Sequence, residues 1–223
     1  MGREEQYLIN ALTSDSSINV THMTSHEARA HFPKTSEELS SKFDVVILTD
    51  VTSDSIILYS DLYSVPMGPN RLKAIEQFVK SGGGLLLIGG WASFGGYMGQ
   101  ARYHGTPVED ALPVLIKDRD DRVEVPEGFR FKVVNESHPI MKGIPWSNAD
   151  FLLLGYNKLK LKSKAELLAE YNGDPIIAVW KYGSGRSMIF ASDCAPRWVG
   201  SFIKWSYYSK FWIQAVKWLA KLM

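Results

Sequence analysis

The sequence predicts a single α/β domain over residues 1–223 with a mainly parallel sheet, and three observations carry that prediction. The stretches 45–48 and 85–88 are continuously apolar, which is typical of strands buried on both faces of a sheet. An amphipathic stretch at 69–81 lies between them and ends at three consecutive glycines, residues 82–84. A strand, a helix and a second strand in this order are the pattern of a parallel sheet joined by right-handed crossovers.

The elements ahead of these strands follow from their periodicity. We expect a helix at 3–12, a half-buried strand at 17–23, an irregular segment at 22–33 and a helix starting at 35–38. The strand at 44–50 then ends in a carboxylate. Because the chain opens with a helix rather than a buried strand, either the strand order differs or a first strand is missing. A missing strand would leave a sheet edge open or covered by a neighbouring chain.

Two further strands are expected at 112–116 and 129–134. The last third of the chain is richer in strands, with four expected at 152–161, 166–171, 175–180 and 187–191. The sequence Asn172-Gly173-Asp174 predicts a tight hairpin, and a helix at 207–222 closes the chain. Three tryptophans lie on or beside that helix, which makes it a candidate surface for a homo-oligomer: Trp205, Trp212 and Trp218.

Composition excludes several classes of protein. The net charge is 25 − 24 = +1, so bulk attraction to nucleic acid or to an anionic membrane is not expected. No apolar run approaches the roughly 18–20 residues that cross a bilayer, and no secretory signal is visible. The single cysteine cannot form an internal disulfide, which favours a reducing compartment, the cytoplasm. The spacing of His22, His26 and His31 fits no metal site, and no cofactor motif is present.

In open α/β sheets, ligands bind beyond the carboxyl ends of the strands. That rule selects the segments 50–54, 89–96 and 193–198. The middle segment, Gly89-Gly90-Trp91-Ala92-Ser93-Phe94-Gly95-Gly96, has three interpretations. It is a structural turn, a loop that binds a ligand such as a phosphate, or a nucleophile elbow in which Ser93 would be the nucleophile.

Two further candidates carry reactive side chains. Arg102, Tyr103 and His104 are consecutive and could bind a carboxylate or a sugar hydroxyl; alternatively Arg102 pairs with an acid and His104 caps the helix at Pro107. Cys194 would be reactive if a nearby positive charge lowered its pKa, but a lone cysteine at a strand end is more often a small buried hydrophobe.

At these residues the chain resembles a known family. The segments GGGLLLIGGWASFGG, ARYHGTPVEDALPV, DDRVEVPEGF, HPIMKGIP and GRSMIFASDCAPRW are similar to those of the glutamine amidotransferase-like family, which is related to the ThuA-like (trehalose utilisation) proteins and to the class I glutamine amidotransferase-like superfamily. The resemblance implies a flavodoxin-like three-layer α/β/α sandwich, and implies that this chain lacks the first strand of its relatives.

The resemblance does not imply the activity in the family's name. A class I glutaminase needs a cysteine at the elbow and a histidine and a glutamate after a late strand. Here the elbow contains Gly90-Trp91-Ala92 and the late strand is followed by Asp193-Cys194-Ala195. We therefore expect glutamine hydrolysis to be absent or negligible. The weak catalytic candidates are Ser93, His104 and Cys194.

Two hypotheses remain open. The first is a site for a small molecule, a carbohydrate, at the carboxyl edge of the sheet. The expected lining residues are Trp91, Ser93, Arg102, Tyr103, His104, Asp193, Cys194 and Trp198. The second is a non-catalytic module for oligomerisation or protein interaction, favoured by the tryptophan-rich last helix and by an open sheet edge.

Overall fold

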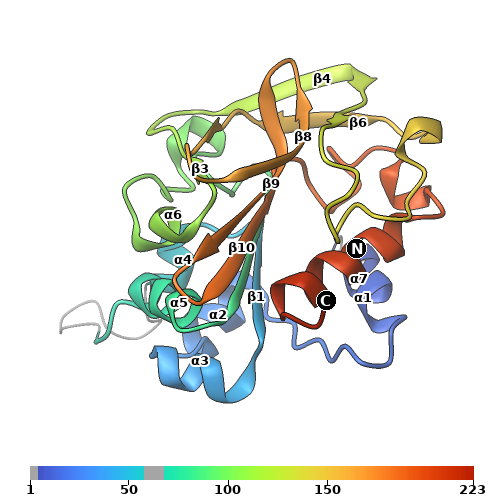
Figure 1. The fold of residues 1–223 in the computed structure, drawn as a ribbon. Coiled ribbons are helices and arrows are strands. Elements are labelled where there is room, and N and C mark those ends of the chain that lie inside the picture. Colours follow the sequence, from blue (N-terminus) through green and yellow to red (C-terminus); the bar gives the residue numbers. More distant parts are fainter. Residues whose placement is uncertain (1–4, 58–67) are drawn as a thin grey trace.

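The computed structural model describes residues 5–57 and 68–223. Within these residues the chain forms seven α-helices and a mixed sheet of six strands (Figure 1). The sheet contains β1 (Val45–Thr49), β2 (Gly84–Ile88), β10 (Gly185–Phe190), β9 (Asp174–Tyr182), β8 (Glu166–Tyr171) and β5 (Lys132–Val133), in that spatial order.

The sheet divides into two halves at β10. The strand β2 pairs in parallel with β1 and with β10, whereas the β10–β9, β9–β8 and β8–β5 pairs are antiparallel. The expected mainly parallel sheet is therefore found only on the β1 side. The antiparallel half follows from tight turns in the sequence, because a two-residue turn reverses the chain where a crossover would not. At the predicted hairpin Asn172 and Gly173 have φ values of 51° and 81°, the left-handed pair that such a turn requires.

Helices cover both faces of the parallel half (Figure 1). On one face lie α1 (Gln6–Thr13) and α7 (Tyr208–Leu219), and on the other α2 (Ser25–His31), α3 (Ser36–Lys42), α4 (Ser53–Ile57) and α5 (Arg71–Lys80). The helix α6 (Pro107–Ala111) contacts α5. The strand β2 is fully buried along its length, as its continuous apolar sequence predicts.

The helix α2 lies in the segment expected to be irregular. Its start is a capping box, in which the Thr24 side chain accepts from the amide of Glu27 and the Glu27 carboxylate accepts from the amide of Thr24. That signal was present in the sequence as a threonine followed three residues later by a glutamate. The helices predicted around 3–12, 35–38, 69–81 and 207–222 are confirmed as α1, α3, α5 and α7.

The strand expected at 17–23 does not form. Residues 18–23 run beside β1 without forming helix or strand, because, among the described residues, no main-chain hydrogen bond joins the two segments as strand pairing requires. Beyond the main sheet, two small antiparallel pairs form: β3 (Val114–Leu115) with β7 (Lys160–Leu161), and β4 (Arg122–Phe129) with β6 (Leu153–Asn157).

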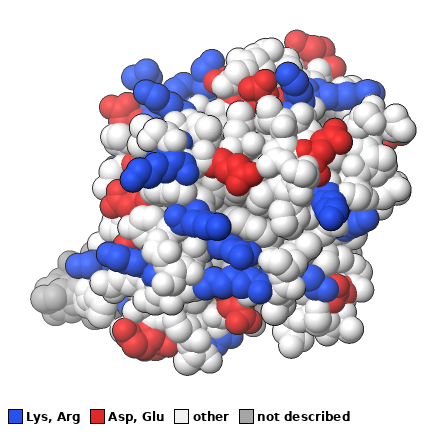
Figure 2. Space-filling model, in the orientation of Figure 1, with Lys and Arg blue, Asp and Glu red and all other residues white. Residues whose placement is uncertain are grey.

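The tryptophans of the closing helix belong to the core. Trp205, Trp212 and Trp218 are 9%, 0% and 6% exposed, and Trp212 packs edge-on against Phe190 of β10. These rings therefore do not form a surface on which a second copy could dock. Acidic and basic side chains both occur across the face shown in Figure 2, as a net charge of +1 leads one to expect. Within the described ranges, no helix has the length and apolarity to cross a membrane.

Candidate functional site

The three parallel strands end side by side. Thr49, Ile88 and Phe190 occupy the same register position, so the segments that follow β1, β2 and β10 meet at one edge of the sheet. The candidate segments 50–54, 89–96 and 193–198 were predicted to lie at this carboxyl edge. A cavity of about 630 Å³ opens beside β1, and its polar end at this edge includes Asp50 and Asp193.

The carboxyl group of Asp193 is buried beside that of Asp50. Asp193 is 3% exposed and accepts a hydrogen bond from the Ala195 amide at 2.9 Å. Burial, and to a smaller extent the negative charge of Asp50, raise the pKa of Asp193 from 3.8 to about 7. Asp50 is exposed, so the edge holds one solvated carboxyl and one that changes its protonation state near neutral pH.

The loop after β2 fixes the position of Asp50. Its amide donates to Ser93 Oγ at 3.0 Å, and its Oδ1 accepts from the Ala92 amide at 2.6 Å. Gly90 has φ 148°, and a Cβ there would lie 2.7 Å from Asp50 Oδ1. Only glycine therefore allows the loop and the carboxylate to approach this closely. Ser93 is fully buried and holds Asp50 by this contact, which favours a structural role over that of a nucleophile.

The glycine-rich loop binds side chains of this chain rather than an open anion site. The amides of Gly95 and Gly96 donate to the Asp121 carboxylate at 2.8 and 2.9 Å. The Gly90 amide donates to Asn157 Oδ1 at 2.9 Å, and Asn157 Nδ2 donates to Asp121 at 2.8 Å. Burial raises the pKa of Asp121. Because these three amides already donate to side chains of the protein, they are not available to bind a phosphate.

Sequence reasoning did not identify Asp121 and Asn157 as residues that contact this loop. Asp121 precedes β4 and Asn157 ends β6, so both come from the small β4–β6 pair. No residue pattern links them to the glycines, because the contact is formed only when that pair packs against the main sheet.

Cys194 is a buried thiol. It is 1% exposed, and its Sγ lies 3.3 Å from Thr49 Oγ1. Burial raises the pKa of Cys194 to about 12, and the neighbouring Asp193 carboxyl acts in the same direction. The thiol is therefore protonated at neutral pH, as expected for a small buried hydrophobe and unlike a nucleophile.

The only large exposed rings at this edge are in the loop after β2, within the described part of the chain. Trp91 and Tyr97 are each 42% exposed and stack with centroids 5.5 Å apart and planes 15° apart. The Arg122 guanidinium lies 4.3 Å from the Trp91 centroid and 4.5 Å from that of Tyr97. Asp120 accepts two hydrogen bonds from the Arg122 guanidinium, at 3.0 and 2.9 Å, and so fixes its orientation. Trp91 is thus held in place while remaining accessible.

The segment 102–104 is ordered by contacts within the protein. Arg102 pairs with Asp54 at 2.9 Å, and the buried Tyr103 hydroxyl donates to the carbonyl of Val51 at 2.8 Å. Burial raises the pKa of Tyr103. His104 Nδ1 lies 2.8 Å from the carbonyl oxygen of Ile116.

The expected pairing of Arg102 with an acid is therefore found. The cap of helix α6 is Thr106 rather than His104. Trp198, the remaining expected lining residue, is 3% exposed and donates from Nε1 to Glu124 at 2.9 Å. Of the eight expected residues, the structure brings Ser93, Asp193 and Cys194 close to Asp50, and Trp91 lies in the loop whose Ala92 amide binds Asp50. Among the described residues, no group of three or more His, Cys, Asp or Glu side chains is arranged to hold a metal ion.

The fold and this edge define a class of α/β protein: a sheet with a parallel half, helices on both faces and polar groups gathered beyond the carboxyl ends of the strands. The chain belongs to the GATase1_like family, described as "Putative glutamine amidotransferase", whose model matches residues 2–221. The family predicted from the sequence motifs is thus confirmed. No sequence match was found among curated proteins.

Solved structures agree with this assignment. Cytoplasmic protein STM3548 from Salmonella typhimurium is 32% identical, with a TM-score of 0.90, and cytoplasmic protein STM1381 from Salmonella typhimurium LT2 is 35% identical, with a TM-score of 0.89. Each match covers 97% of this chain and 87% of the other. A ThuA-like protein from Parabacteroides merdae ATCC 43184 is 12% identical over 97% of this chain and 84% of that one, with a TM-score of 0.53, which is a likeness of fold alone.

Proposed function

We propose that this protein binds a small polyhydroxylated molecule, a carbohydrate, at the carboxyl edge of the sheet. One observation carries the proposal: the buried Asp193, whose pKa is raised to about 7, lies beside the exposed Asp50 at the polar end of the 630 Å³ cavity. A buried carboxyl with a strongly shifted pKa in a cavity is a common mark of a functional site. The cavity volume lies within the range of small-molecule sites.

The chemistry of the two carboxyls suits a hydroxyl-rich ligand. Asp50 accepts hydrogen bonds, and Asp193 near neutral pH both donates and accepts them, so the pair matches hydroxyl groups that do the same. Trp91, next to the Ala92 amide that binds Asp50, offers an exposed ring on which the apolar face of a sugar could stack. The resemblance to ThuA-like proteins, associated with sugar metabolism, favours the same ligand class.

We propose further that the protein does not hydrolyse glutamine. The amides of Gly90 and Ala92, at the position of an oxyanion-binding elbow, donate to Asn157 and Asp50. Cys194 is buried with a pKa of about 12. The cytoplasm is the proposed compartment, since the single cysteine suits a reducing environment and both Salmonella relatives are named as cytoplasmic proteins.

The alternative is a non-catalytic interaction module. The buried rings of α7 remove one of its two supports. The other, the edge of β1 that is unpaired among the described strands, is a specific observation in its favour.

The test is a binding measurement on the intact chain with a panel of mono- and disaccharides, sugar acids, nucleotides and glutamine. We expect one sugar to raise the melting temperature, and calorimetric titration to show at least tenfold weaker binding to Asp50→Asn and to Trp91→Ala. Asp150→Asn and Tyr7→Ala change exposed side chains that belong neither to the cavity lining nor to the loop after β2, and should bind as the wild type does. If no sugar raises the melting temperature, or if Asp50→Asn binds a sugar as tightly as the wild type does, the proposal is refuted. Binding of glutamine would restore the amidotransferase interpretation.

A further inference from the structure

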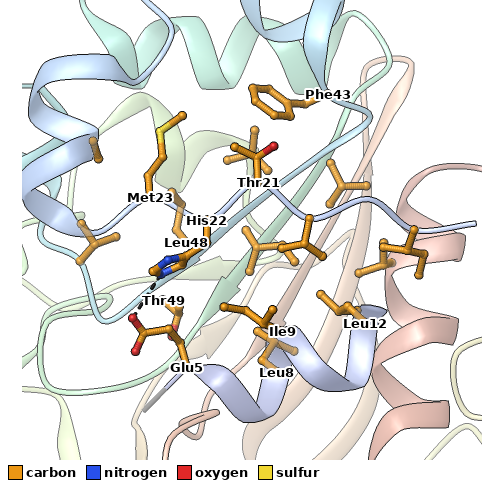
Figure 3. Close-up of a pocket in the computed structure, with 18 of the residues that line it drawn as sticks. Glu5, Leu8, Ile9, Leu12, Thr21, His22, Met23, Phe43, Leu48 and Thr49 are labelled. Atoms are coloured by element: carbon orange, nitrogen blue, oxygen red, sulfur yellow. Dashed lines mark ion pairs between the residues drawn. The ribbon is translucent and has the colours of Figure 1, made fainter. Parts of the chain in front are cut away.

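A second cavity lies beside β5, the strand at the opposite edge of the main sheet from β1. It has a volume of about 260 Å³ and is formed by residues 130–133 on one side and residues in the range 146–151 on the other. The described residues that line it are all different from those that line the larger cavity, several of which Figure 3 shows on α1, residues 21–23 and β1. We call this second cavity the β5 pocket. A ligand bound there would not contact the carboxyl edge described above.

Three aromatic rings form an apolar floor in the β5 pocket. Phe131 packs against Trp146 and Phe151, with ring centroids 5.6 and 5.5 Å apart, and each ring is at most 9% exposed. Trp146 also donates from Nε1 to the carbonyl oxygen of Met141 at 2.9 Å. Because packing and this hydrogen bond hold the rings in place, binding of an apolar group requires little further ordering of the protein.

Charged side chains of both signs surround this floor. Arg130 and Lys132 are exposed on either side of the buried Phe131, the alternation of an extended strand, and the exposed Glu136 also lines the pocket. Within residues 5–57 and 68–223, Arg130, Lys132 and Glu136 form no ion pair, either with one another or with other residues. The pocket therefore offers cations to a carboxylate and, separately, a carboxylate to a cation.

The two cations differ in their surroundings. Lys132 lies directly opposite Glu170 in the β5–β8 pair, so an acidic residue is its cross-strand neighbour. Arg130 precedes β5 and, among the described strand pairs, has no residue opposite it. A guanidinium can also donate two parallel hydrogen bonds to one carboxylate, which an ammonium cannot. Arg130 is therefore the stronger candidate to bind a carboxylate, with Lys132 adding positive charge.

We propose that the β5 pocket binds a free α-amino acid with an apolar side chain. The carboxylate of the amino acid pairs with Arg130, its ammonium group pairs with Glu136, and its side chain lies on the aromatic floor. The cavity volume is slightly below the roughly 300–1,000 Å³ of sites for drug-sized ligands, which suits a molecule as small as an amino acid. This site goes beyond carbohydrate binding, which concerns the other cavity.

Ligands with one charge or with none fit the pocket less well. An aryl carboxylate would pair with Arg130 but would bring a second negative charge close to Glu136, and an amine would bring a second positive charge close to Arg130 and Lys132. A sugar would give neither kind of charge a counter-ion. A zwitterion gives each charge a partner and leaves an uncharged side chain for the rings.

The experiment is calorimetric titration of the intact chain with L-phenylalanine, and we expect saturable binding. Phenylpropionate lacks the ammonium group, phenylethylamine lacks the carboxylate, and glycine lacks the apolar side chain. Each of these three should bind about tenfold more weakly than L-phenylalanine, because each loses one of the three contacts.

Two variants test which residue binds which group. Glu136→Gln should bind L-phenylalanine and phenylpropionate with equal affinity, and Arg130→Gln should bind L-phenylalanine and phenylethylamine with equal affinity. A loss of folding would weaken all ligands alike and would not produce these two changes of preference. Glu127→Gln and Lys142→Gln change exposed charges outside the pocket lining and should keep the preferences of the wild type.

Three results would overturn the proposal. The first is an absence of saturable binding of L-phenylalanine. The second is equal affinity of the wild type for L-phenylalanine and phenylpropionate, because the ammonium group would then have no partner. The third is wild-type affinity for L-phenylalanine in both Arg130→Gln and Glu136→Gln, which would place the binding elsewhere. Asp50→Asn, which tests the carbohydrate proposal, should bind L-phenylalanine as the wild type does, so the two proposals succeed or fail separately.

Discussion

The substitution Asp193→Asn tests whether this carboxyl titrates near neutral pH. Asparagine keeps the shape of the side chain, and its oxygen can still accept the Ala195 amide, at 2.9 Å in the wild type. What the substitution removes is the ionisable group. Because burial raises the pKa of Asp193 to about 7, the folded protein holds a proton that the unfolded chain has already released.

The sign and the size of the effect follow from that difference. A carboxyl with a higher pKa in the folded state destabilises the fold as the pH rises, beginning near the unfolded value of 3.8 and reaching its full extent above pH 7. At roughly 1.4 kcal/mol for each pKa unit, the full loss is about 4 kcal/mol, of which about 3 kcal/mol falls between about pH 5 and about pH 8. In Asp193→Asn this loss is absent.

The assay is urea denaturation of both proteins across that range of pH. The free energy of unfolding of Asp193→Asn minus that of the wild type should increase by about 3 kcal/mol from about pH 5 to about pH 8. Burial lowers the pKa of His138, which destabilises the fold as the pH falls, but this residue is common to both proteins and cancels. If the two curves run parallel, Asp193 does not change its protonation state in this range, and the carboxyl pair loses its role in the carbohydrate proposal.

Three further predictions concern the same edge. Cys194, with its pKa raised from 9.0 to about 12, should react with iodoacetamide about a thousandfold more slowly in the native than in the unfolded protein at pH 8; rapid native labelling would contradict its burial. Asn157→Ala removes a buried side chain that bonds Gly90 and Asp121, and should lower the free energy of unfolding by about 3 kcal/mol in urea titrations, whereas an effect near zero would mean that the loop is held by other contacts. Gly90→Ala should lower the melting temperature more than Gly105→Ala, because both glycines have positive φ but only at Gly90 would the new Cβ meet an atom, Asp50 Oδ1; equal shifts would remove the role of that close approach.

Apolar and amphipathic patterns within short stretches of the sequence were enough to predict the parallel half of the fold. The fully apolar stretch 85–88 predicts a strand buried on both faces, and β2 is such a strand. The helix 69–81 is confirmed because Asn70 and the apolar spacing lie within one short stretch of chain, and Asn70 caps α5 as such a residue should. The segment 17–23 shows the limit: its alternation is that of a strand, but a strand also needs a neighbour, and sequence alone does not reveal whether the neighbour is present.

The sequence was enough to predict the edge of the sheet where the candidate site lies, but not all of the residues that line the site. The rule for carboxyl ends of strands correctly brought together the segments after β1, β2 and β10, because strand order follows from topology. It could not tell that Tyr103 and Trp198 are buried while Trp91 is exposed, since the direction of a loop side chain depends on tertiary packing. Nor could it find Asn157, which reaches the loop from a strand 67 residues away.

The loop after β2 also bears on how this fold could be redesigned. Its amides donate to the Asp50 and Asp121 carboxylates and to the Asn157 side-chain oxygen. These oxygens take the place of the oxyanion that the amides of a catalytic loop would bind. The substitution Trp91→Cys would place a nucleophile at the elbow, but the neighbouring amides of Gly90 and Ala92 already donate hydrogen bonds and could not bind an oxyanion. A redesign would first have to remove the Asp50 and Asp121 carboxylates from these amides and then stabilise the loop conformation with other contacts. The side chains that order this loop are thus the same ones that occupy the amides an oxyanion would need.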